Sequence, residues 1–270
     1  MASNLLALPW RPAPHPIRDA LRSPWTLAVL CVIAITGFWT ATGSTPAAFR
    51  SLWTWSPALL RGMWANIEIS ILAMALGTVA GLVIGALSLS THGWVRHAAR
   101  LWVQAFRNAP ILVLVYFTTY VFPFELHIAQ WTVPFPDWIK VVLGLALPAS
   151  ANVAEIFRGA IQSIPSAQWE AAQSLAFRRR QIFRLIVLPQ CVRRMLPPWM
   201  NLYASITMST SLASLVGVHD VVDTAQVASN TVARTDFTVL VYFTLLALFF
   251  AYCYPIARAT RALERRHDRH

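Results

Sequence analysis

Charge is scarce in this sequence, because Asp, Glu, Lys and Arg together make up only 12% of its 270 residues. Soluble domains usually carry about twice that share. Hydrophobic residues account for 57%, and the mean hydropathy is +0.53. The shortage of charge excludes an ordinary soluble domain. It predicts an all-α integral membrane protein, with enough length for several helices of roughly 20 residues.

Cysteine and lysine are also scarce. Cys31, Cys191 and Cys253 stand far apart and form no C-x-x-C pair, so the sequence signals neither a zinc site nor a disulfide framework. We expect them to be packing residues, and we expect no bound metal. Lys140 is the only lysine and follows Ile139, so the G-x-x-x-x-G-K-[ST] loop that cradles nucleotide phosphates is missing.

The basic residues lie in short clusters beside apolar runs. A formal net charge of +11 could indicate nucleic-acid binding if it followed one soluble face. Clusters that flank apolar runs are instead typical of membrane helices. We therefore expect no nucleic-acid partner and expect contact with membrane lipids.

Apolar runs bounded by charge or proline predict six transmembrane helices. Arg107 to Pro110 interrupts the third run, and Pro197 opens the fifth, which is tolerable where neighbouring protein satisfies the freed carbonyls. The tail before the first run carries three arginines and is long for a signal peptide, so we expect an uncleaved helix. The predicted helices lie near residues 24–43, 64–89, 100–122, 138–160, 195–217 and 237–257.

The distribution of arginine and lysine predicts the orientation. Three lie in the N-terminal tail, three in residues 90–108, seven in residues 158–194 and five in the tail from Arg258, against four on the opposite side. Because cytoplasmic loops carry the excess of basic residues, both termini and the 165–190 loop should face the cytoplasm.

A few residues inside the predicted helices stand out. Gly77, Gly81 and Gly85 recur at every fourth position and so form one smooth face, suited either to packing within the bundle or to a dimer contact. Glu68 is a carboxylate within a span, which indicates function unless it reaches water at the helix end. Glu155 either belongs to a polar stripe along a cavity or pairs with Arg158.

The 165–190 loop predicts two short helices. Pro165 should stop the preceding helix, and Ser166 should cap a new one whose Trp169, Ala172 and Ala176 form a narrow apolar face. A second amphipathic helix should run from about Arg178 and end at Pro189. Two such helices can lie on lipid headgroups or dock on a soluble partner, and the pattern favours neither.

The stretch EAAQSLAFRRRQIFRLIVLPQ, residues 170–190, resembles the EAA loop of bacterial ABC importer permeases. The family pattern is EAA, three residues, Gly, about nine more and an apolar-x-Leu-Pro. FRNAPILVLVYF is similar to the family's FRGTPLLVQLFF, and AEIFRGAIQSIPSAQWEAA is near-typical of polar amino-acid permeases of the histidine and glutamine permease type. LPQCVRRMLPPWMN and TSLASLVGV follow in the family's order.

This resemblance implies an ABC type I importer permease that carries polar amino acids and has no catalytic residue of its own. Its partners would be a cytoplasmic ATPase dimer that binds ATP and Mg, a second permease subunit in a homodimer or heterodimer, and an extracytoplasmic solute-binding protein. The chain itself would bind no cofactor and would lie in the bacterial inner membrane. The residues implied to couple it to the ATPase are Glu170, Ala171, Ala172, Leu175, Ala176, Arg180 and Pro189.

Three features depart from the family pattern. Ala176 stands where the family has glycine, so a left-handed backbone there would strain the turn, or the first helix would lengthen. Met208 and Ser209 replace a Lys-Asp pair that many relatives carry. A first helix precedes the usual five, which divides the chain into residues 1–58, a tail plus extra helix, and residues 59–270, the importer domain.

A substrate path for a zwitterion requires polar side chains at depth, facing inward. The available ones are Glu68, Asn152, Glu155, Thr207, Ser209, Thr210 and Ser211. We favour Asn152, Glu155, Ser209 and Ser211, although hydrogen bonds between helices explain them equally well. Two other classes remain open from the residues: a secondary transporter with Glu68 or Glu155 as the titrating group, and a membrane scaffold whose basic loop binds anionic lipid.

Overall fold

The computed structural model describes residues 45–128 and 131–267. The predicted first helix, residues 24–43, and Cys31 lie outside these residues. The chain divides into two compact units, Met1–Ser51 and Leu52–His270. The features described below lie in the second unit, except for the first turns of α3, and the boundary at residues 58 and 59 stays a prediction.

Within the described residues, three unbroken helices are long and apolar enough to cross a membrane. They are α3 (Thr45–Ser88), α6 (Asp137–Gln162) and α11 (Thr235–His267), and they confirm the second, fourth and sixth predicted helices. α3 begins about 20 residues earlier than predicted, because Arg61 and Pro57 do not interrupt it.

The third predicted span is a broken pair, α4 (Gly93–Asn108) and α5 (Ile111–Val121), bent by 105°. Ala109 lies between them with φ −77° and ψ 136°. A residue before proline avoids the helical region, so Pro110 explains why the helix breaks there. Pro110 is also the cap residue of α5.

The 165–190 loop, called the EAA segment from here on, holds α7 (Ser166–Ser174), α8 (Arg179–Ile182) and the π-helix η1 (Phe183–Val187). α9 (Leu188–Ser209) follows without a break, and the 3-10 helix η2 (Thr210–Val216) completes the fifth predicted span. The prediction that Pro189 ends a helix is wrong. Pro189 lies in the first turn of α9, where a missing N–H costs no hydrogen bond. Ser166 begins α7 and does not cap it, since Pro165 holds the cap position.

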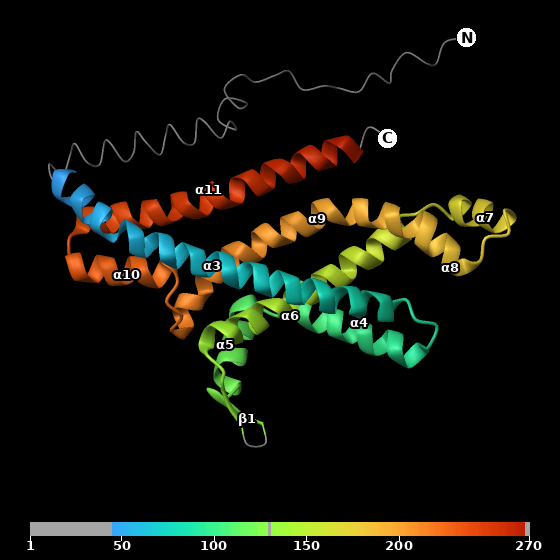
Figure 1. Cartoon of the computed structure of the whole chain (residues 1–270), viewed down its shortest axis with the longest axis horizontal. Coiled ribbons are helices and arrows are strands. Elements are labelled where there is room, and N and C mark those ends of the chain that lie inside the picture. The colour runs from blue at the N-terminus through green and yellow to red at the C-terminus, as the bar shows by residue number, and fades with distance from the viewer. Residues whose placement is uncertain (1–44, 129–130, 268–270) are drawn as a thin grey trace, which may run out of the picture. The chain divides into compact units, whose positions relative to one another are not determined.

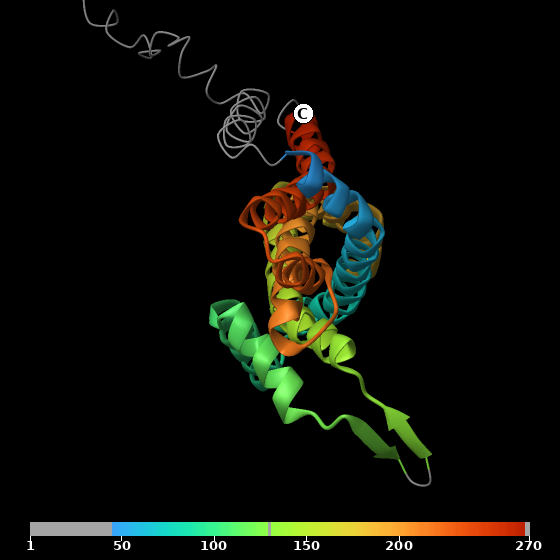
Figure 2. The same ribbon diagram turned by 90° about the vertical axis from the view of Figure 1, so that its left-hand side faces the viewer.

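The connections between the third and fourth and between the fifth and sixth predicted helices contain regular structure that the sequence did not reveal. One is a hairpin in which β1 (Glu125–Ile128) pairs antiparallel with β2 (Trp131–Pro134), Glu125 opposite Pro134. The hairpin projects beyond the helices (Figure 2). The other is α10 (Val221–Val232), whose cap residue Asp220 accepts a hydrogen bond from the backbone N–H of Asp223.

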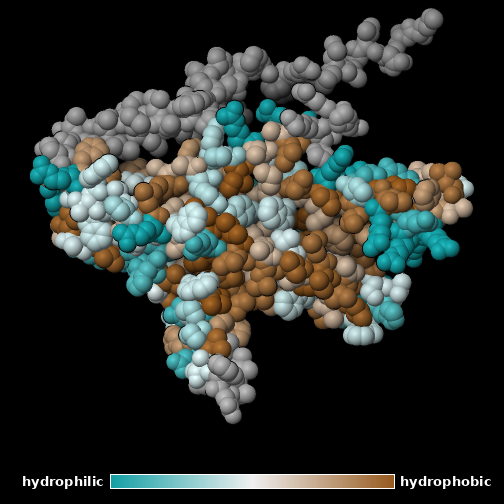
Figure 3. Space-filling model, viewed as in Figure 1, coloured by the Kyte–Doolittle hydropathy of each residue, from teal (hydrophilic) through white to brown (hydrophobic). Residues whose placement is uncertain are grey.

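α6 is the central helix, since it packs against α4, α5, α9 and η2, while α11 packs against α9 and α10. α7 and α8 lie at one end of the arrangement and α10 at the other (Figure 1). Hydrophobic side chains cover the middle of the visible face, and hydrophilic ones gather at α8 (Figure 3). The apolar middle is what a lipid-facing belt requires.

Glycines on α3 let it approach α6 closely. A Cβ on Gly77 would lie 2.6 Å from the Cβ of Ala149, and one on Gly81 would lie 2.6 Å from the carbonyl oxygen of Ser150. A Cβ on Gly85 would meet the ring of Phe157 at 2.8 Å. All three therefore face α6 within the chain, which is the geometry of helix packing by small residues.

Candidate functional site

The EAA segment is held to the chain by its own small apolar cluster. Ala172 of α7 is 3% exposed and packs with Ile182, Val187 and Cys191. Trp169 packs against the same cluster. The apolar face predicted for α7 therefore serves packing within this chain, and Ala176 is not part of it because it lies beyond the helix end.

The turn after α7 has a left-handed residue. Ala176 has φ +58°, and its N–H donates to the carbonyl of Gln173 while the N–H of Phe177 donates to that of Ala172. This pair of bonds is the Schellman motif, in which glycine is the usual left-handed residue. Alanine at this position costs roughly 1–2 kcal/mol relative to its right-handed conformation. Of the two outcomes predicted for Ala176, the structure shows the strained turn.

Other side chains of the EAA segment face solvent. Glu170 and Ala171 are exposed, and Leu175 is 73% exposed, which is unusual for a leucine at the edge of a polar helix. Arg180 and Pro189 are exposed as well. These side chains form an open surface that combines one acid, small residues and one large apolar group.

Two hydrogen bonds link α7 to α9 and α9 to the end of α6. Gln190 of α9 donates to Gln168 of α7 at 2.7 Å. Arg194 of α9 donates to the carbonyl oxygen of Ser163 at 2.6 Å, just after α6 ends. Arginine satisfies free carbonyls and complements the dipole at a helix C-terminus. α7 is therefore linked directly to α9 and, through α9, to the end of α6.

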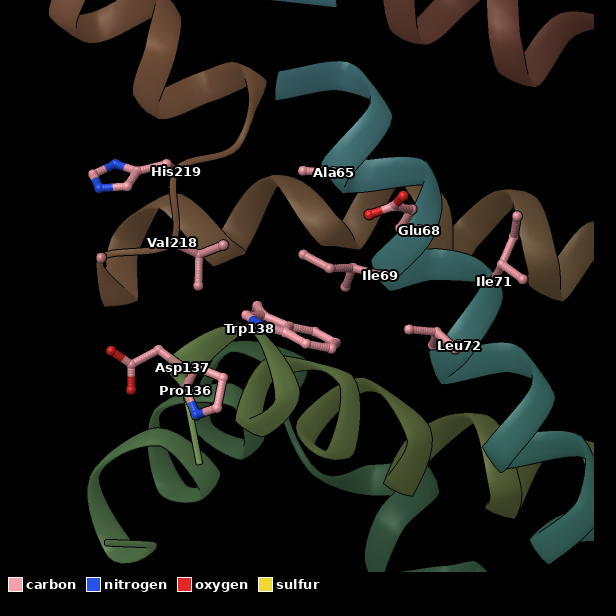
Figure 4. Close-up of a pocket in the computed structure, with 11 residues that line it drawn as sticks. Ala65, Glu68, Ile69, Ile71, Leu72, Pro136, Asp137, Trp138, Val218 and His219 are labelled. Atoms are coloured by element: carbon pink, nitrogen blue, oxygen red, sulfur yellow. The ribbon is translucent and has the colours of Figure 1, made fainter. Parts of the chain in front are cut away.

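A cavity of about 690 Å³ lies between α3 and the start of α6 and is called the α3–α6 pocket here. Glu68 of α3 and Trp138 of α6 face it together, and His219 stands at its edge (Figure 4). Its volume is in the range that holds a small molecule. The lining is mainly apolar, with the carboxylates of Glu68 and Asp137 as its charged groups.

Each carboxylate of this pocket has a fixed partner. Glu68 accepts a hydrogen bond from the indole N–H of Trp64. Asp137 lies 3.0 Å from the ammonium of Lys140, which is fully buried and stands over the ring of Phe124. A buried lysine needs such a partner to remain charged. Glu68 is thus the carboxylate left to meet a cation that enters the pocket.

A buried polar cluster lies next to this pocket. Asn66 donates to Thr210 and to Asp220, both at 3.0 Å, and accepts from the backbone N–H of Val221. Sequence reasoning did not single out Asn66 or Asp220. The signal was present, because Asn66 lies two residues before Glu68 in an apolar helix, where an amide must find partners.

The structure separates the predicted substrate-path residues. Glu68 lines the α3–α6 pocket, and Glu155 lines a second cavity between α4 and α6, paired with Arg158 as the alternative reading predicted. The remaining five direct a side-chain hydrogen bond to a backbone carbonyl of their own helix or turn and line neither cavity: Asn152, Thr207, Ser209, Thr210 and Ser211. A role for these five in the path stays a prediction.

A metal-binding arrangement is missing from the described part of the chain. Among residues 45–128 and 131–267, no three His, Cys, Asp or Glu side chains come together. Cys191 and Cys253 are free and buried, as expected of packing residues.

The helices and the EAA segment define a membrane-spanning transport subunit. Residues 77–269 match the family of the binding-protein-dependent transport system inner membrane component. The match covers more than half of the chain, which therefore belongs to this family as a permease component.

Several relatives are similar over most of their length. The octopine transport system permease protein OccM of Rhizobium radiobacter is 32% identical, over 79% of this chain and 87% of that protein. The probable amino-acid ABC transporter permease protein YckA of Bacillus subtilis is 31% identical, over 78% and 89%. The L-cystine transport system permease protein TcyB of the same species is 28% identical, over 82% and 90%.

Solved structures agree with the fold. The crystal structure of an amino acid ABC transporter with histidines matches with a TM-score of 0.71 and 25% identity, over 81% of this chain and 98% of that one. A bacterial ABC transporter involved in the import of alginate matches with a TM-score of 0.60 and 16% identity, over 92% and 99%. The second likeness shows the fold alone. The type I importer permease fold predicted from the sequence is confirmed.

Proposed function

We propose that this chain is the translocation subunit of an importer for polar amino acids, driven by a separate ATPase. The observation that carries the proposal is the construction of the EAA segment. One side of α7 is buried against the chain's own cluster through Ala172, and the other presents Glu170, Ala171 and Leu175. A helix fixed from behind and open in front suits docking into a groove of a partner.

The route from the partner to the membrane is short. α7 is tied to α9 by the Gln168–Gln190 hydrogen bond. η2 follows α9 directly, and its first residue, Thr210, accepts a hydrogen bond from Asn66 of α3. ATP and Mg would bind to the partner ATPase and not to this chain. Closure of an ATPase dimer would then move α6 and α9 together. The full transporter would contain two permease subunits and an extracytoplasmic solute-binding protein.

Polar amino acids are the proposed cargo. Relatives at 31% and 28% identity are named for amino-acid and L-cystine transport. The α3–α6 pocket is large enough for such a molecule, and Glu68 is placed to meet its ammonium group. A proton-driven transporter is less well supported, because the Glu155 carboxylate is held by Arg158.

Assembly with the ATPase tests the proposal. The chain is co-expressed with the ABC ATPase subunits encoded in the same genome, and the tagged chain is purified from membranes in mild detergent. We expect the ATPase to co-purify with the parent chain but to be largely lost with Glu170→Lys. The control is Gln226→Lys, at an exposed position on α10, and the ATPase should co-purify with it as with the parent. Equal recovery with all three chains would refute docking through α7.

The proposed orientation places both termini and the EAA segment in the cytoplasm. The support is the excess of arginine at that end, including Arg178, Arg179 and Arg180. Reporter fusions after residues 130 and 225 should both report the extracytoplasmic side. A cytoplasmic signal from either fusion would overturn the orientation.

A further inference from the structure

A second cavity, of about 370 Å³, lies between α4 and the C-terminal half of α6 and is called the basic pocket here. Arg100, Gln104 and Arg107 line it from α4, and Glu155 and Arg158 line it from α6. Ser88, the last residue of α3, closes one side. The pocket is separate from the α3–α6 pocket, with which it shares no lining residue.

The charges of the basic pocket do not cancel. Three guanidinium groups face one carboxylate. Arg158 is fully engaged, because it donates from two nitrogens to the two oxygens of Glu155 and from a third to Gln162 at 2.7 Å. The Glu155–Arg158 pair is therefore close to neutral and leaves the other two arginines in excess.

Those two arginines have few acceptors. Arg107 comes only to 3.9 Å from Glu155, which is too long for a hydrogen bond. Within the residues that the structure describes, the Arg100 and Gln104 side chains form no hydrogen bond and no ion pair. The pocket thus holds two guanidinium groups and one amide with donors to spare.

The spacing on α4 brings these donors together. Positions 100, 104 and 107 are separated by one helical turn each, so they lie on one face. A guanidinium matches the planar geometry of a carboxylate or phosphate and can bond it through two nitrogens. Arginines inside a predicted span are costly unless they face protein or an aqueous cavity, and here they face a cavity.

We propose that the basic pocket binds an oxyanion, a carboxylate or a phosphate, through Arg100, Gln104 and Arg107. Two sources offer this chemistry: the carboxylate of the amino acid as it leaves the membrane, and the phosphate of an anionic lipid. The first source rests on the proposed function, and the second does not. Glu155 limits affinity by its own charge and by engaging Arg158.

Direct binding tests the site without any need for turnover. The purified transporter complex is prepared with the parent chain, with Arg100→Gln/Arg107→Gln, and with Arg96→Gln. Arg96 is an exposed arginine on the same helix that does not line the pocket. Native mass spectrometry compares retention of phosphatidylglycerol with that of phosphatidylcholine, and equilibrium dialysis in neutral lipid compares L-glutamine with L-glutaminamide, which lacks the carboxylate.

We expect the parent and Arg96→Gln to favour either phosphatidylglycerol over phosphatidylcholine or L-glutamine over L-glutaminamide. The double variant should lose about tenfold or more in affinity for that probe, since two charge-assisted hydrogen bonds disappear. Preference for phosphatidylglycerol identifies the lipid source, and preference for L-glutamine over its amide identifies the cargo.

A variant that is expected to bind more tightly than the parent distinguishes a specific effect on the site from misfolding. Glu155→Gln removes the competing carboxylate and frees Arg158, so it should bind the same probe more tightly than the parent. The basic pocket is not an oxyanion site if the parent and the double variant bind phosphatidylglycerol equally and also bind L-glutamine equally. The same conclusion follows if Glu155→Gln weakens binding. Assembly with the ATPase and ATP-driven uptake are measured separately, so failure here leaves the proposed function intact.

Discussion

Asn66 of α3 donates a 3.0 Å hydrogen bond to the carboxylate of Asp220, although the two residues lie 154 positions apart in the sequence. Both side chains are fully buried. Because Asn66 also bonds Thr210 and the backbone of Val221, one amide joins α3 to η2 and to the start of α10. Gly62 permits this approach, since a Cβ there would lie 2.7 Å from the Cα of Val221.

Asp220→Ala should destabilise the chain by about 1–3 kcal/mol, because it leaves one N–H of the buried Asn66 amide without an acceptor and α10 without its cap. The melting temperature of the detergent-solubilised chain measures the loss. Asn230→Ala, at an exposed position of the same helix, is the control and should melt with the parent. Identical melting of all three chains would show that the cluster contributes no stability.

The same residue predicts a pH dependence. Asp220 lies in the connection before α10, and burial raises the pKa of its carboxyl above the ordinary value, against the hydrogen bonds from Asp223 and Asn66 that lower it. A folded-state pKa above the unfolded one means that the folded chain binds the proton more readily, so the charged form costs stability at neutral pH. This cost should diminish as the pH falls toward the raised pKa.

Melting temperatures of the parent and Asp220→Asn, compared from neutral to mildly acidic pH, check this dependence. Both chains carry His219→Ala, because His219 contacts Asp223, whose backbone N–H donates to Asp220. The Asp220 chain should gain stability relative to Asp220→Asn as the pH falls. A constant difference would mean that burial does not shift this carboxyl.

Gly81→Ala should separate α3 from α6. The new Cβ would lie 2.6 Å from both the Ser150 carbonyl oxygen and the Val153 Cβ, so the helices must move apart at a cost of typically 1–3 kcal/mol. Gly159→Ala is the matched control, because its Cβ meets nothing within 4 Å and alanine favours the helix. Thermal melting should rank Gly81→Ala below the parent and Gly159→Ala at or above it, and the reverse order would refute the close packing.

Ala176→Gly should stabilise the EAA segment by about 1 kcal/mol, since glycine adopts the left-handed conformation without the clash that alanine suffers. Ala171→Gly, in the middle of α7, should lose about the same amount of helix stability. Hydrogen exchange of the α7 amides resolves the two effects. Faster exchange in Ala176→Gly than in the parent would show that the turn is not strained.

The sequence predicted the parts of the fold that depend on local pattern. Apolar length was sufficient to place α3, α6 and α11, and Arg107 to Pro110 marked the break between α4 and α5. Periodicity did not show that Pro189 opens α9, because proline is compatible with both the first turn and the position after a helix. The β1–β2 hairpin was missed, since each strand has four residues and the second ends in proline.

The candidate sites likewise contain contacts that local sequence pattern predicts and contacts that it does not. Glu155 and Arg158 are three positions apart, so their pairing could be predicted from helix geometry. The Asn66–Asp220 bond and the meeting of Arg107 with Glu155 join distant segments, and no local pattern specifies such contacts. The inward face of Ala172 was likewise set by η1 and α9, which pack behind α7.

ATP-driven uptake of a labelled amino acid into vesicles tests the central claim, that α7 couples a partner ATPase to transport. The vesicles contain the complete transporter with either Glu170→Lys or Gln226→Lys, which place a lysine at an exposed position on α7 or on α10. We expect Gln226→Lys to transport like the parent. Glu170→Lys should lose nearly all uptake while its permease chain remains folded in the membrane with an unchanged melting temperature. Uptake at the parent's rate with Glu170→Lys would contradict the account.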